Sequence, residues 1–184
     1  GRTSWDQLGS AVAMADVNAD GRKDLIATAP GWDHSASTSV DEGAVYVFLG
    51  KSSFPATIDL ASQSAEIFVE GHNSANHIGG TLQAGDFNGD GVGDFMFGTR
   101  DGARAGYSGE GRLFVIYGRA GIPSAFSVQA EDVSLVINGD VDGLQLGDTL
   151  GAGDLDGDGA DEMFAAAPFV NSSTGTLFVF DLSL

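Results

Sequence analysis

Three short segments of this chain combine acidic and amide side chains with a glycine in a pattern that can bind a metal ion. They are residues 16–24, 86–94 and 154–162, and each has an oxygen-bearing side chain at its positions 1, 3, 5 and 9 and glycine at position 6. Hard cations such as Ca²⁺ take about six to eight oxygen ligands, and alternating carboxylates around a sharp glycine turn supply them. The oxygen-bearing side chains are those of Asp16, Asn18, Asp20 and Asp24, of Asp86, Asn88, Asp90 and Asp94, and of Asp154, Asp156, Asp158 and Glu162. We therefore expect three Ca²⁺ sites.

The three acidic segments lie within a longer repeat. Their starts are 70 and 68 residues apart, and similar residues flank each of them. Leu8-Gly9, Ile78-Gly79 and Leu146-Gly147 precede them, and the apolar stretches 43–50, 111–118 and 175–181 follow them. A repeat of this length indicates stacked or radial structural units. We place three units at residues 8–71, 78–139 and 146–184 of a single segment that spans 1–184.

Each unit is predicted to consist of β-strands. Short apolar runs rich in Val, Phe, Ile and Tyr are bounded by Gly, Pro and Asp, which is typical of strands. The predicted strands are 10–16, 24–30, 43–50 and 65–71, then 81–86, 94–100, 111–118 and 133–139, and finally 148–154, 162–168 and 175–182. The stretches 55–63 and 123–132 could each hold a short turn, and no long segment has helical periodicity.

These elements predict an all-β fold made of β-propeller blades, with three four-stranded units of which the last lacks its outer strand. Four-stranded units that repeat along a chain pack face to face around an axis in a propeller. A sandwich of two packed sheets is the alternative, and the similarity of the units argues against it. Closed propellers have about four to eight blades. The chain is therefore expected to be a segment of a larger propeller or to close a ring with a second copy.

The units resemble FG-GAP repeats, which are the blades of integrin α-subunit propellers and of related bacterial proteins. The resemblance covers essentially the whole chain and rests on the acidic loops, on the three apolar-Gly pairs named above, and on Thr28-Ala29-Pro30 and Ala166-Ala167-Pro168. The middle unit departs from it with Gly98-Thr99-Arg100, and the third loop departs from it with Glu162 in place of aspartate.

This resemblance implies a seven-bladed propeller with Ca²⁺ loops between the first two strands of certain blades, on the face away from the usual ligand surface. It also implies that the twelve side chains named above are the metal ligands. Position 7 of each loop would add its backbone carbonyl, and these residues are Arg22, Val92 and Ala160.

An EF-hand fits the loops less well. It requires Glu at loop position 12 between two helices. The three loops have Ala27, Phe97 and Ala165 at that position, and strand patterns flank them.

Composition limits the partners and the location. The chain has 26 acidic and 8 basic residues, with a formal net charge of −18. This argues against nucleic-acid binding, which needs a basic surface. No cysteine is present to form a disulfide framework, and no run of about 18 apolar residues could span a membrane. Because the millimolar Ca²⁺ outside cells suits weak oxygen-ligand loops, we expect an extracellular or periplasmic protein.

Function is expected to rest on recognition, with Ca²⁺ holding each blade together. We name no catalytic residue, because the ion would occupy the loop carboxylates. His34, His72 and His77 lie in loops rich in small polar residues, and the pairs Asp41-Glu42 and Glu131-Asp132 fit turns. The prediction is a calcium-binding recognition or cell-adhesion module, integrin-like, with an unknown protein or carbohydrate ligand. Its candidate exposed contacts are Trp32, Arg104 and Tyr107.

The alternative is the propeller part of an extracellular enzyme, such as a polysaccharide lyase or a phospholipase-like protein. Such a site would need clustered basic and tyrosine side chains in the variable loops. Arg100, Arg104, Tyr107 and Arg112 form the only such cluster, which is why we favour the noncatalytic interpretation.

Overall fold

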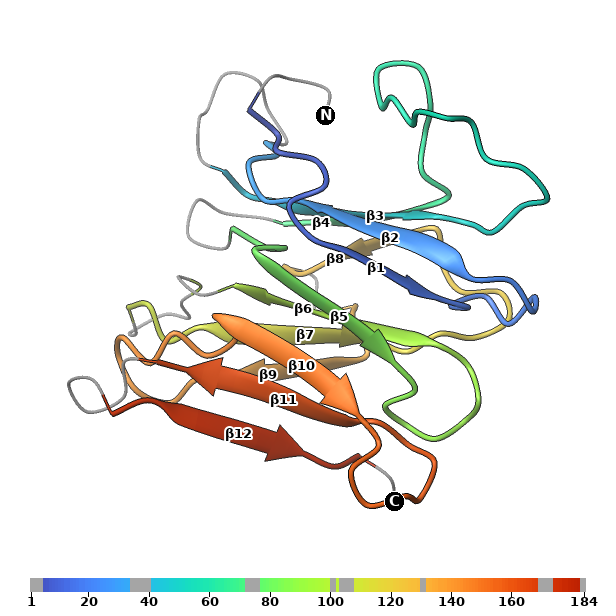
Figure 1. Cartoon of the computed structure of the whole chain (residues 1–184). Coiled ribbons are helices and arrows are strands. Elements are labelled where there is room, and N and C mark those ends of the chain that lie inside the picture. The colour runs from blue at the N-terminus through green and yellow to red at the C-terminus, as the bar shows by residue number, and fades with distance from the viewer. Residues whose placement is uncertain are drawn as a thin grey trace.

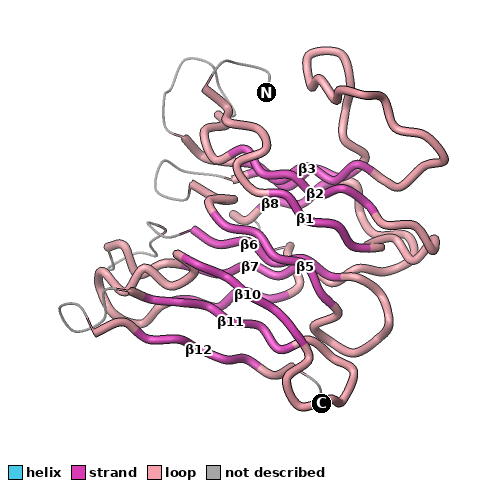
Figure 2. Tube along the Cα trace, viewed as in Figure 1, coloured by secondary structure: helices cyan, strands magenta, loops and turns pink. Residues whose placement is uncertain are grey.

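The computed structural model describes residues 5–33, 41–71, 77–99, 102, 108–129, 132–168 and 174–182. These residues form twelve β-strands and no helix. The strands make three sheets, which are stacked one on another from the N-terminus to the C-terminus (Figure 1). The Cα trace shows the same three layers, with the loops gathered at the two ends of the strands (Figure 2). The predicted all-β class is confirmed.

The first sheet has the strand order β1-β2-β3-β4-β8. Its first four strands are β1 (Val12–Ala15), β2 (Asp24–Ala29), β3 (Ala44–Phe48) and β4 (Ile67–Glu70), and each runs antiparallel to its neighbour. The fifth strand, β8 (Ala125–Ser127), pairs in parallel with β4. Because β8 comes from the repeat that builds the second sheet, it links the two sheets.

The second and third sheets follow the same antiparallel plan. The second consists of β5 (Thr81–Gly85), β6 (Asp94–Thr99), β7 (Arg112–Ile116) and β9 (Leu135–Asn138). The third consists of β10 (Thr149–Gly153), β11 (Glu162–Ala167) and β12 (Thr176–Phe180). All eleven predicted strands are present, with slightly shorter ends.

The strand β8 was not predicted, whereas the short turn expected within 123–132 is present at residues 128–129, directly after it. Three residues are too few to show a strand periodicity. Their only large apolar side chain is Phe126, which is buried against the first sheet. The free edge of β4 makes this segment a strand, and a partner so distant in the chain leaves no local signal in the sequence.

The middle sheet is buried on both faces. Phe95, Phe97 and Phe114 face the first sheet, and the ring centroid of Phe97 lies 6.3 Å from that of Phe95 and 5.5 Å from that of Phe114. Met96 and Leu113 face the third sheet. Because successive side chains of a strand point to opposite faces, a sheet covered on both sides needs apolar residues at nearly every position. This explains the continuous apolar runs of β6 and β7.

The outer face of the first sheet is partly covered by loops of its own repeat. Trp32 and Leu60 pack over Tyr46 and Phe68, and the ring centroids of Trp32 and Phe68 are 5.2 Å apart. Trp32 is only 5% exposed, so the prediction that it is an exposed ligand contact was wrong. Within the described ranges, no helix is long and apolar enough to cross a membrane.

Candidate metal sites

The three acidic loops connect the first strand of each sheet to the second. They join β1 to β2, β5 to β6 and β10 to β11, and they lie at the same end of the stack (Figure 1). Residues about 70 positions apart in the sequence therefore form one row along the molecule.

The first carboxylate of each loop closes a turn of the loop's own backbone. Asp16 accepts hydrogen bonds from the backbone N–H groups of Asp20 (3.0 Å) and Gly21 (2.8 Å). Asp86 makes the corresponding bonds with Asp90 (3.1 Å) and Gly91 (2.8 Å). Asp154 accepts from Gly159 (3.2 Å) at the same position as Gly21, but its other donor is Gly157 (2.7 Å), one residue earlier in the loop. In each loop the carboxylate thus fixes the turn that brings the other oxygen side chains together.

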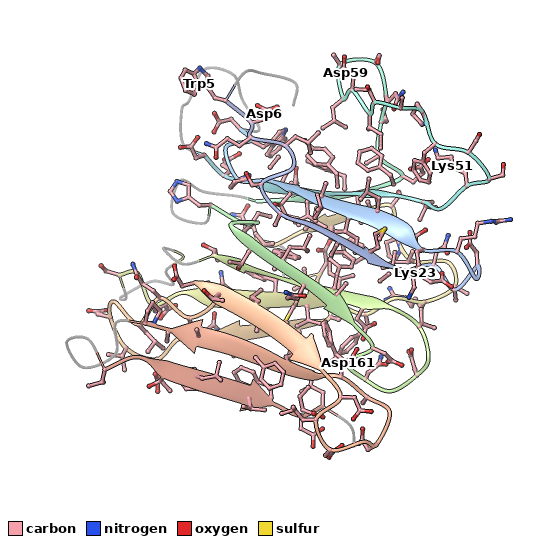
Figure 3. All side chains as sticks on the ribbon, viewed as in Figure 1. Trp5, Asp6, Lys23, Lys51, Asp59 and Asp161 are labelled. Carbon is pink, nitrogen blue, oxygen red and sulfur yellow. The ribbon has the colours of Figure 1, made fainter. Side chains whose placement is uncertain are left out.

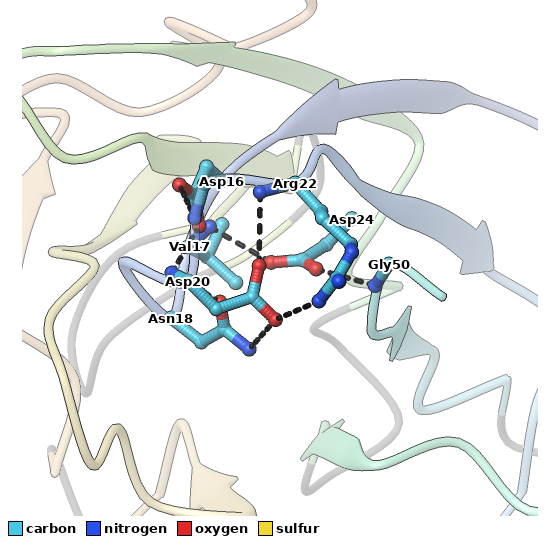
Figure 4. Close-up of polar contacts among 8 residues, drawn as sticks. Asp16, Val17, Asn18, Asp20, Arg22, Asp24 and Gly50 are labelled. Carbon is cyan, nitrogen blue, oxygen red and sulfur yellow. Dashed lines mark hydrogen bonds and ion pairs between the residues drawn. The ribbon is translucent and has the colours of Figure 1, made fainter. Parts of the chain in front are cut away.

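The third and fifth side chains each bind the backbone N–H two residues ahead. Asn18 Oδ1 accepts from Asp20 (3.1 Å), and Asp20 Oδ1 accepts from Arg22 (2.9 Å), as Figure 4 shows. The equivalent bonds of the second and third loops are between 2.8 and 3.1 Å long. The three loops therefore share the hydrogen bonds of positions 3 and 5. Each carboxylate or amide oxygen has a second lone pair that remains available to a cation.

Two positions of each loop have a left-handed backbone. The glycine at position 6 has φ angles of 84°, 81° and 98° at Gly21, Gly91 and Gly159. Position 4 is glycine in the second and third loops, but Ala19 holds it in the first loop with a φ of 60°. An ordinary L-residue in this region costs about 1–2 kcal/mol.

We expect Ala19→Gly to stabilise the protein and Gly89→Ala to destabilise it, each by about 0.5–1 kcal/mol. Gly89 has a φ of 68°, and a Cβ there would meet the Cβ of Ala160 at 3.4 Å, which is not a severe clash. The backbone conformation therefore dominates both effects. Thermal unfolding in saturating Ca²⁺ measures the pair, and shifts in the same direction would contradict the argument.

The ninth side chain ties each of the first two loops to the end of its sheet. Asp24 is fully buried and accepts hydrogen bonds from Val17 (2.9 Å), within the loop, and from Gly50 (2.7 Å), just after β3 (Figure 4). Asp94 makes the same two bonds, at 2.9 and 2.8 Å, in the second sheet. This side chain therefore couples the loop to the end of the next strand of its sheet, β3 or β7.

The third loop has an unsatisfied oxygen at the same place. Glu162 Oε2 accepts a hydrogen bond from Leu155 (2.6 Å), whereas its Oε1 is buried and has no hydrogen-bond partner. Burying a polar atom without a partner costs free energy, and a bound cation would satisfy it. Ligand oxygens of Asp154, Asp156 and Glu162 all lie within 4.8 Å of one another. Among the described residues, this is the acidic cluster that can hold a metal ion, and its all-oxygen donor set fits a hard divalent cation.

Electrostatics favour an ion at this cluster. Two unit charges 4.8 Å apart repel by about 3 kcal/mol at an effective dielectric of about 20, and hydration of the exposed Asp154 and Asp156 reduces this value. A divalent cation replaces the mutual repulsion with attraction to a common centre. Since the unfolded chain does not hold these side chains together, the energy of binding stabilises the fold.

Burial raises the pKa of the two aspartates at position 9. The pKa of Asp94 is raised to about 7 by burial and, to a smaller extent, by Asp90 and Asp86, against the opposing effect of its two backbone hydrogen bonds. Burial also raises the pKa of Asp24. Without a metal ion, these carboxyls are therefore poorly suited to carry a negative charge.

We expect the metal-free chain to lose stability as the pH rises from about 5 to about 8. The pKa of Asp94 is about 7 in the folded state and close to its ordinary value of 3.8 in the unfolded state. The folded state therefore binds more protons between these values, and the free energy of unfolding falls as the pH rises through about 7. Chemical unfolding in excess EGTA measures this slope. Asp94→Asn should flatten it, and a slope of opposite sign in the wild type would contradict the prediction.

Backbone hydrogen bonds join each loop to the next. Gly93 donates its N–H to the carbonyl of Asp16 (2.9 Å), and Asp161 donates to the carbonyl of Asp86 (2.7 Å). The Asp161 carboxylate also accepts from the N–H of Asp86 (2.9 Å), and Figure 3 shows Asp161 beside the second and third sheets. Position 8 of one loop thus bonds position 1 of the preceding loop. The sequence analysis missed this link, for which the equal spacing of the loops was the only signal.

A polar cavity lies at the opposite end of the strands. It has a volume of about 310 Å³, and its lining includes Gln7, Asp41, His77, Thr81 and Asp148. Thr81 begins β5, whereas the acidic loop follows the end of this strand. The Nε2 atom of His77 lies 4.0 Å from Asp41 Oδ2. The sequence analysis did not identify this cavity, because it brings together residues from all three repeats.

Of the basic and tyrosine cluster singled out in the sequence, the structure describes Arg112. Arg112 donates a hydrogen bond to Asn138 Oδ1 (2.8 Å) and lies over the ring of Phe114, so its contacts are structural. Six other residues that the sequence analysis named lie outside the described ranges: His34, His72, Arg100, Arg104, Tyr107 and Glu131.

Known proteins match this chain along most of its length. Residues 8–48 match the FG-GAP repeat. Phosphatidylinositol-glycan-specific phospholipase D of Rattus norvegicus is 30% identical over 170 residues, covering 90% of this chain and 19% of that protein. The enzyme of the same name from Mus musculus is 31% identical over 167 residues, with the same coverage. Integrin alpha-PS3 of Drosophila melanogaster is 29% identical over 118 residues, covering 64% of this chain and 9% of that protein.

The chain spans about a fifth or less of the length of these relatives. Among solved structures, the rhamnogalacturonan lyase YesW has a TM-score of 0.49 and 15% identity, covering 94% of this chain and 32% of that one.

Proposed function

Residues 8–48 form an FG-GAP repeat, and from this premise we propose that the whole chain is a calcium-binding, noncatalytic recognition module that forms part of a β-propeller. In this proposal the three sheets are consecutive blades, and each holds one Ca²⁺ in its acidic loop. The ions stabilise the blades and take no part in a reaction. Recognition of a protein or carbohydrate then falls to the opposite end, where the polar cavity lies.

Each ion would be bound by the side chains at loop positions 1, 3, 5 and 9 and by the carbonyl of position 7, which belongs to Arg22, Val92 or Ala160. Bidentate binding by one or two carboxylates would complete a coordination number of about six to eight. The observation that carries the proposal is the third loop, where carboxylate oxygens of Asp154, Asp156 and Glu162 lie within 4.8 Å of one another and Glu162 Oε1 is buried without a partner. The hydrogen bonds of positions 3 and 5, which all three loops share, extend it to the other two loops.

Calorimetric titration of the metal-free chain with Ca²⁺ is expected to give three ions per chain. Glu162→Gln should reduce this to two, because a neutral amide removes the charge that completes the third site. Glu162→Asp is the matched control and should retain three ions, since aspartate holds the same position at Asp24 and Asp94. Asp156→Asn should keep the stoichiometry with weaker binding, because Asn18 and Asn88 occupy that position in the other loops. An unchanged stoichiometry in Glu162→Gln would contradict the assignment of the third loop.

We place the module outside the cell or in the periplasm. Loops that combine exposed carboxylates with an amide ligand resemble extracellular Ca²⁺ modules, whose dissociation constants are about 10⁻⁴–10⁻³ M. Such sites stay filled where Ca²⁺ is millimolar and empty in the cytosol. A dissociation constant below about 10⁻⁷ M would remove this argument for the location.

A second candidate function is the noncatalytic part of a phospholipase-like enzyme. The observation that favours it is the match of nine-tenths of this chain to proteins named phosphatidylinositol-glycan-specific phospholipase D. Because the matched part is about a fifth of each enzyme, the reaction would take place in other parts of such a protein. We therefore expect the 184-residue chain alone not to hydrolyse a glycosylated phosphatidylinositol. Hydrolysis by this chain would overturn the noncatalytic assignment in both candidates.

A further inference from the structure

Asp161 makes two hydrogen bonds to a single residue of the preceding acidic loop. Its backbone N–H donates to the carbonyl of Asp86 (2.7 Å), and its carboxylate Oδ2 accepts from the N–H of Asp86 (2.9 Å). The second bond is partly buried, which makes it stronger than the same bond in water. Asp86 is the first oxygen-bearing residue of the second loop, so Asp161 holds that loop at the start of its proposed set of metal ligands.

Asp161 is not one of the proposed ligands of the third ion, but it lies between two of them in the sequence. Ala160 precedes it and would bind that ion through its backbone carbonyl. Glu162 follows it and carries the buried, unsatisfied Oε1. Because planar peptide bonds join these residues, an ion that fixes Ala160 and Glu162 also fixes the backbone of Asp161. The direction of the Asp161 side chain toward Asp86 therefore depends on the third loop.

A second contact brings the same two loops together. Ala160 is only 4% exposed, and a Cβ added at Gly89, in the second loop, would meet the Cβ of Ala160 at 3.4 Å. The two loops therefore pack directly against each other beside the pair of hydrogen bonds. Because closely packed groups transmit small displacements, ordering one loop restricts the conformations that the other can adopt.

Between the first and second loops, a glycine replaces this aspartate. Gly93 bonds the carbonyl of Asp16 through its backbone N–H (2.9 Å). A Cβ at Gly93 would lie 2.6 Å from the Cβ of Ala15, so a side chain there would require the backbone to shift. At the other junction the sizes are exchanged: Gly85 stands in place of Ala15, and a Cβ on it would lie 2.6 Å from Asp161 Oδ2. The glycine in the second sheet thus makes room for the carboxylate of Asp161.

We propose that Asp161 is a positioning residue that makes the second and third Ca²⁺ sites cooperative. An ion in the third loop fixes Asp161 against Asp86 and so raises the affinity of the second loop for its own ion. Coupling between two sites is reciprocal, so the second ion raises the affinity of the third loop by the same factor. Such couplings are about 5–150-fold, and we expect about tenfold here. The inference rests on the proposed function, because it requires Ca²⁺ in both loops.

A Ca²⁺ titration followed by NMR of the isotope-labelled chain tests the proposal, because each loop carries its own probe. The backbone N–H groups of Gly21, Gly91 and Gly159 each donate to the first carboxylate of their own loop. The titration is made in about 0.15 M salt, which screens repulsion between the ions. We expect the signals of Gly91 and Gly159 to change together along one sigmoidal curve, because each of these two ions favours the other.

A cycle of variants isolates the part played by Asp161. Glu162→Gln, which removes the third ion, should raise the Ca²⁺ concentration that half-saturates Gly91 by about threefold, because two equal sites share a tenfold coupling. In the Asp161→Gly background, Glu162→Gln should leave that concentration unchanged. Asp161→Asn is the matched control and should keep the threefold effect, since its amide oxygen can accept the same hydrogen bond. The half-saturation of Gly21 should be the same in every variant.

The possible failures are distinguishable. If Glu162→Gln has no effect on Gly91 in the otherwise wild-type chain, the two sites are independent and the coupling is overturned. If the effect persists in Asp161→Gly, or is lost in Asp161→Asn, the hydrogen bond of Asp161 does not carry it. If none of the three glycine signals responds to Ca²⁺, the proposed function itself is overturned.

Discussion

Removal of Ca²⁺ is expected to lower the melting temperature of this chain by about 15–30 °C. A ligand that binds only the folded state, at a concentration of about 100 times its dissociation constant, adds about 2.7 kcal/mol. Three such sites add about 8 kcal/mol, and each kcal/mol corresponds to about 2–4 °C for a chain of this size. Circular dichroism in saturating Ca²⁺ and again in excess EGTA measures the difference.

The variants at Glu162 give this experiment its internal control. Glu162→Gln should remove about a third of the Ca²⁺-dependent rise, because two of the three sites remain, whereas Glu162→Asp should retain most of it. Saturating Mg²⁺ should stabilise less than Ca²⁺, because Mg²⁺ demands a near-octahedral shell and gives up its waters reluctantly. Equal melting temperatures in Ca²⁺ and EGTA would contradict the proposal that the loops are structural metal sites.

The acidic loops were predictable because their interactions are local. The side chains of Asp16, Asn18 and Asp20 accept hydrogen bonds from backbone groups no more than five residues away. The spacing of the oxygen side chains and the glycine in the sequence therefore predicts most of the loop conformation. The bond from Gly50 to Asp24 spans 26 residues and depends on how β3 ends beside β2. The buried, unsatisfied oxygen of Glu162 likewise depends on its three-dimensional surroundings. Both features depend on how the strands pack, so they cannot be predicted from the sequence of the loop alone.

The sheets show the same division between local and distant information. Strand positions follow from apolar runs and their boundaries, which the sequence displays directly. The pairing of β8 with β4 and the packing of Trp32 over Phe68 do not. Both involve an apolar side chain in a segment rich in small or polar residues, and the surface that buries it belongs to another element. Exposure of an aromatic loop residue therefore cannot be inferred from the composition of its loop.

The same leucine position should matter greatly in the second sheet and little in the third. Leu113→Ala removes a fully buried side chain from between two sheets and is expected to cost about 2–5 kcal/mol. Leu177→Ala is its matched control, because Leu177 occupies the corresponding ladder position but is 63% exposed, and it should cost less than about 1 kcal/mol. Chemical unfolding at a concentration where the chain is monomeric compares them. An equal cost of the two substitutions would contradict the difference in burial between these positions.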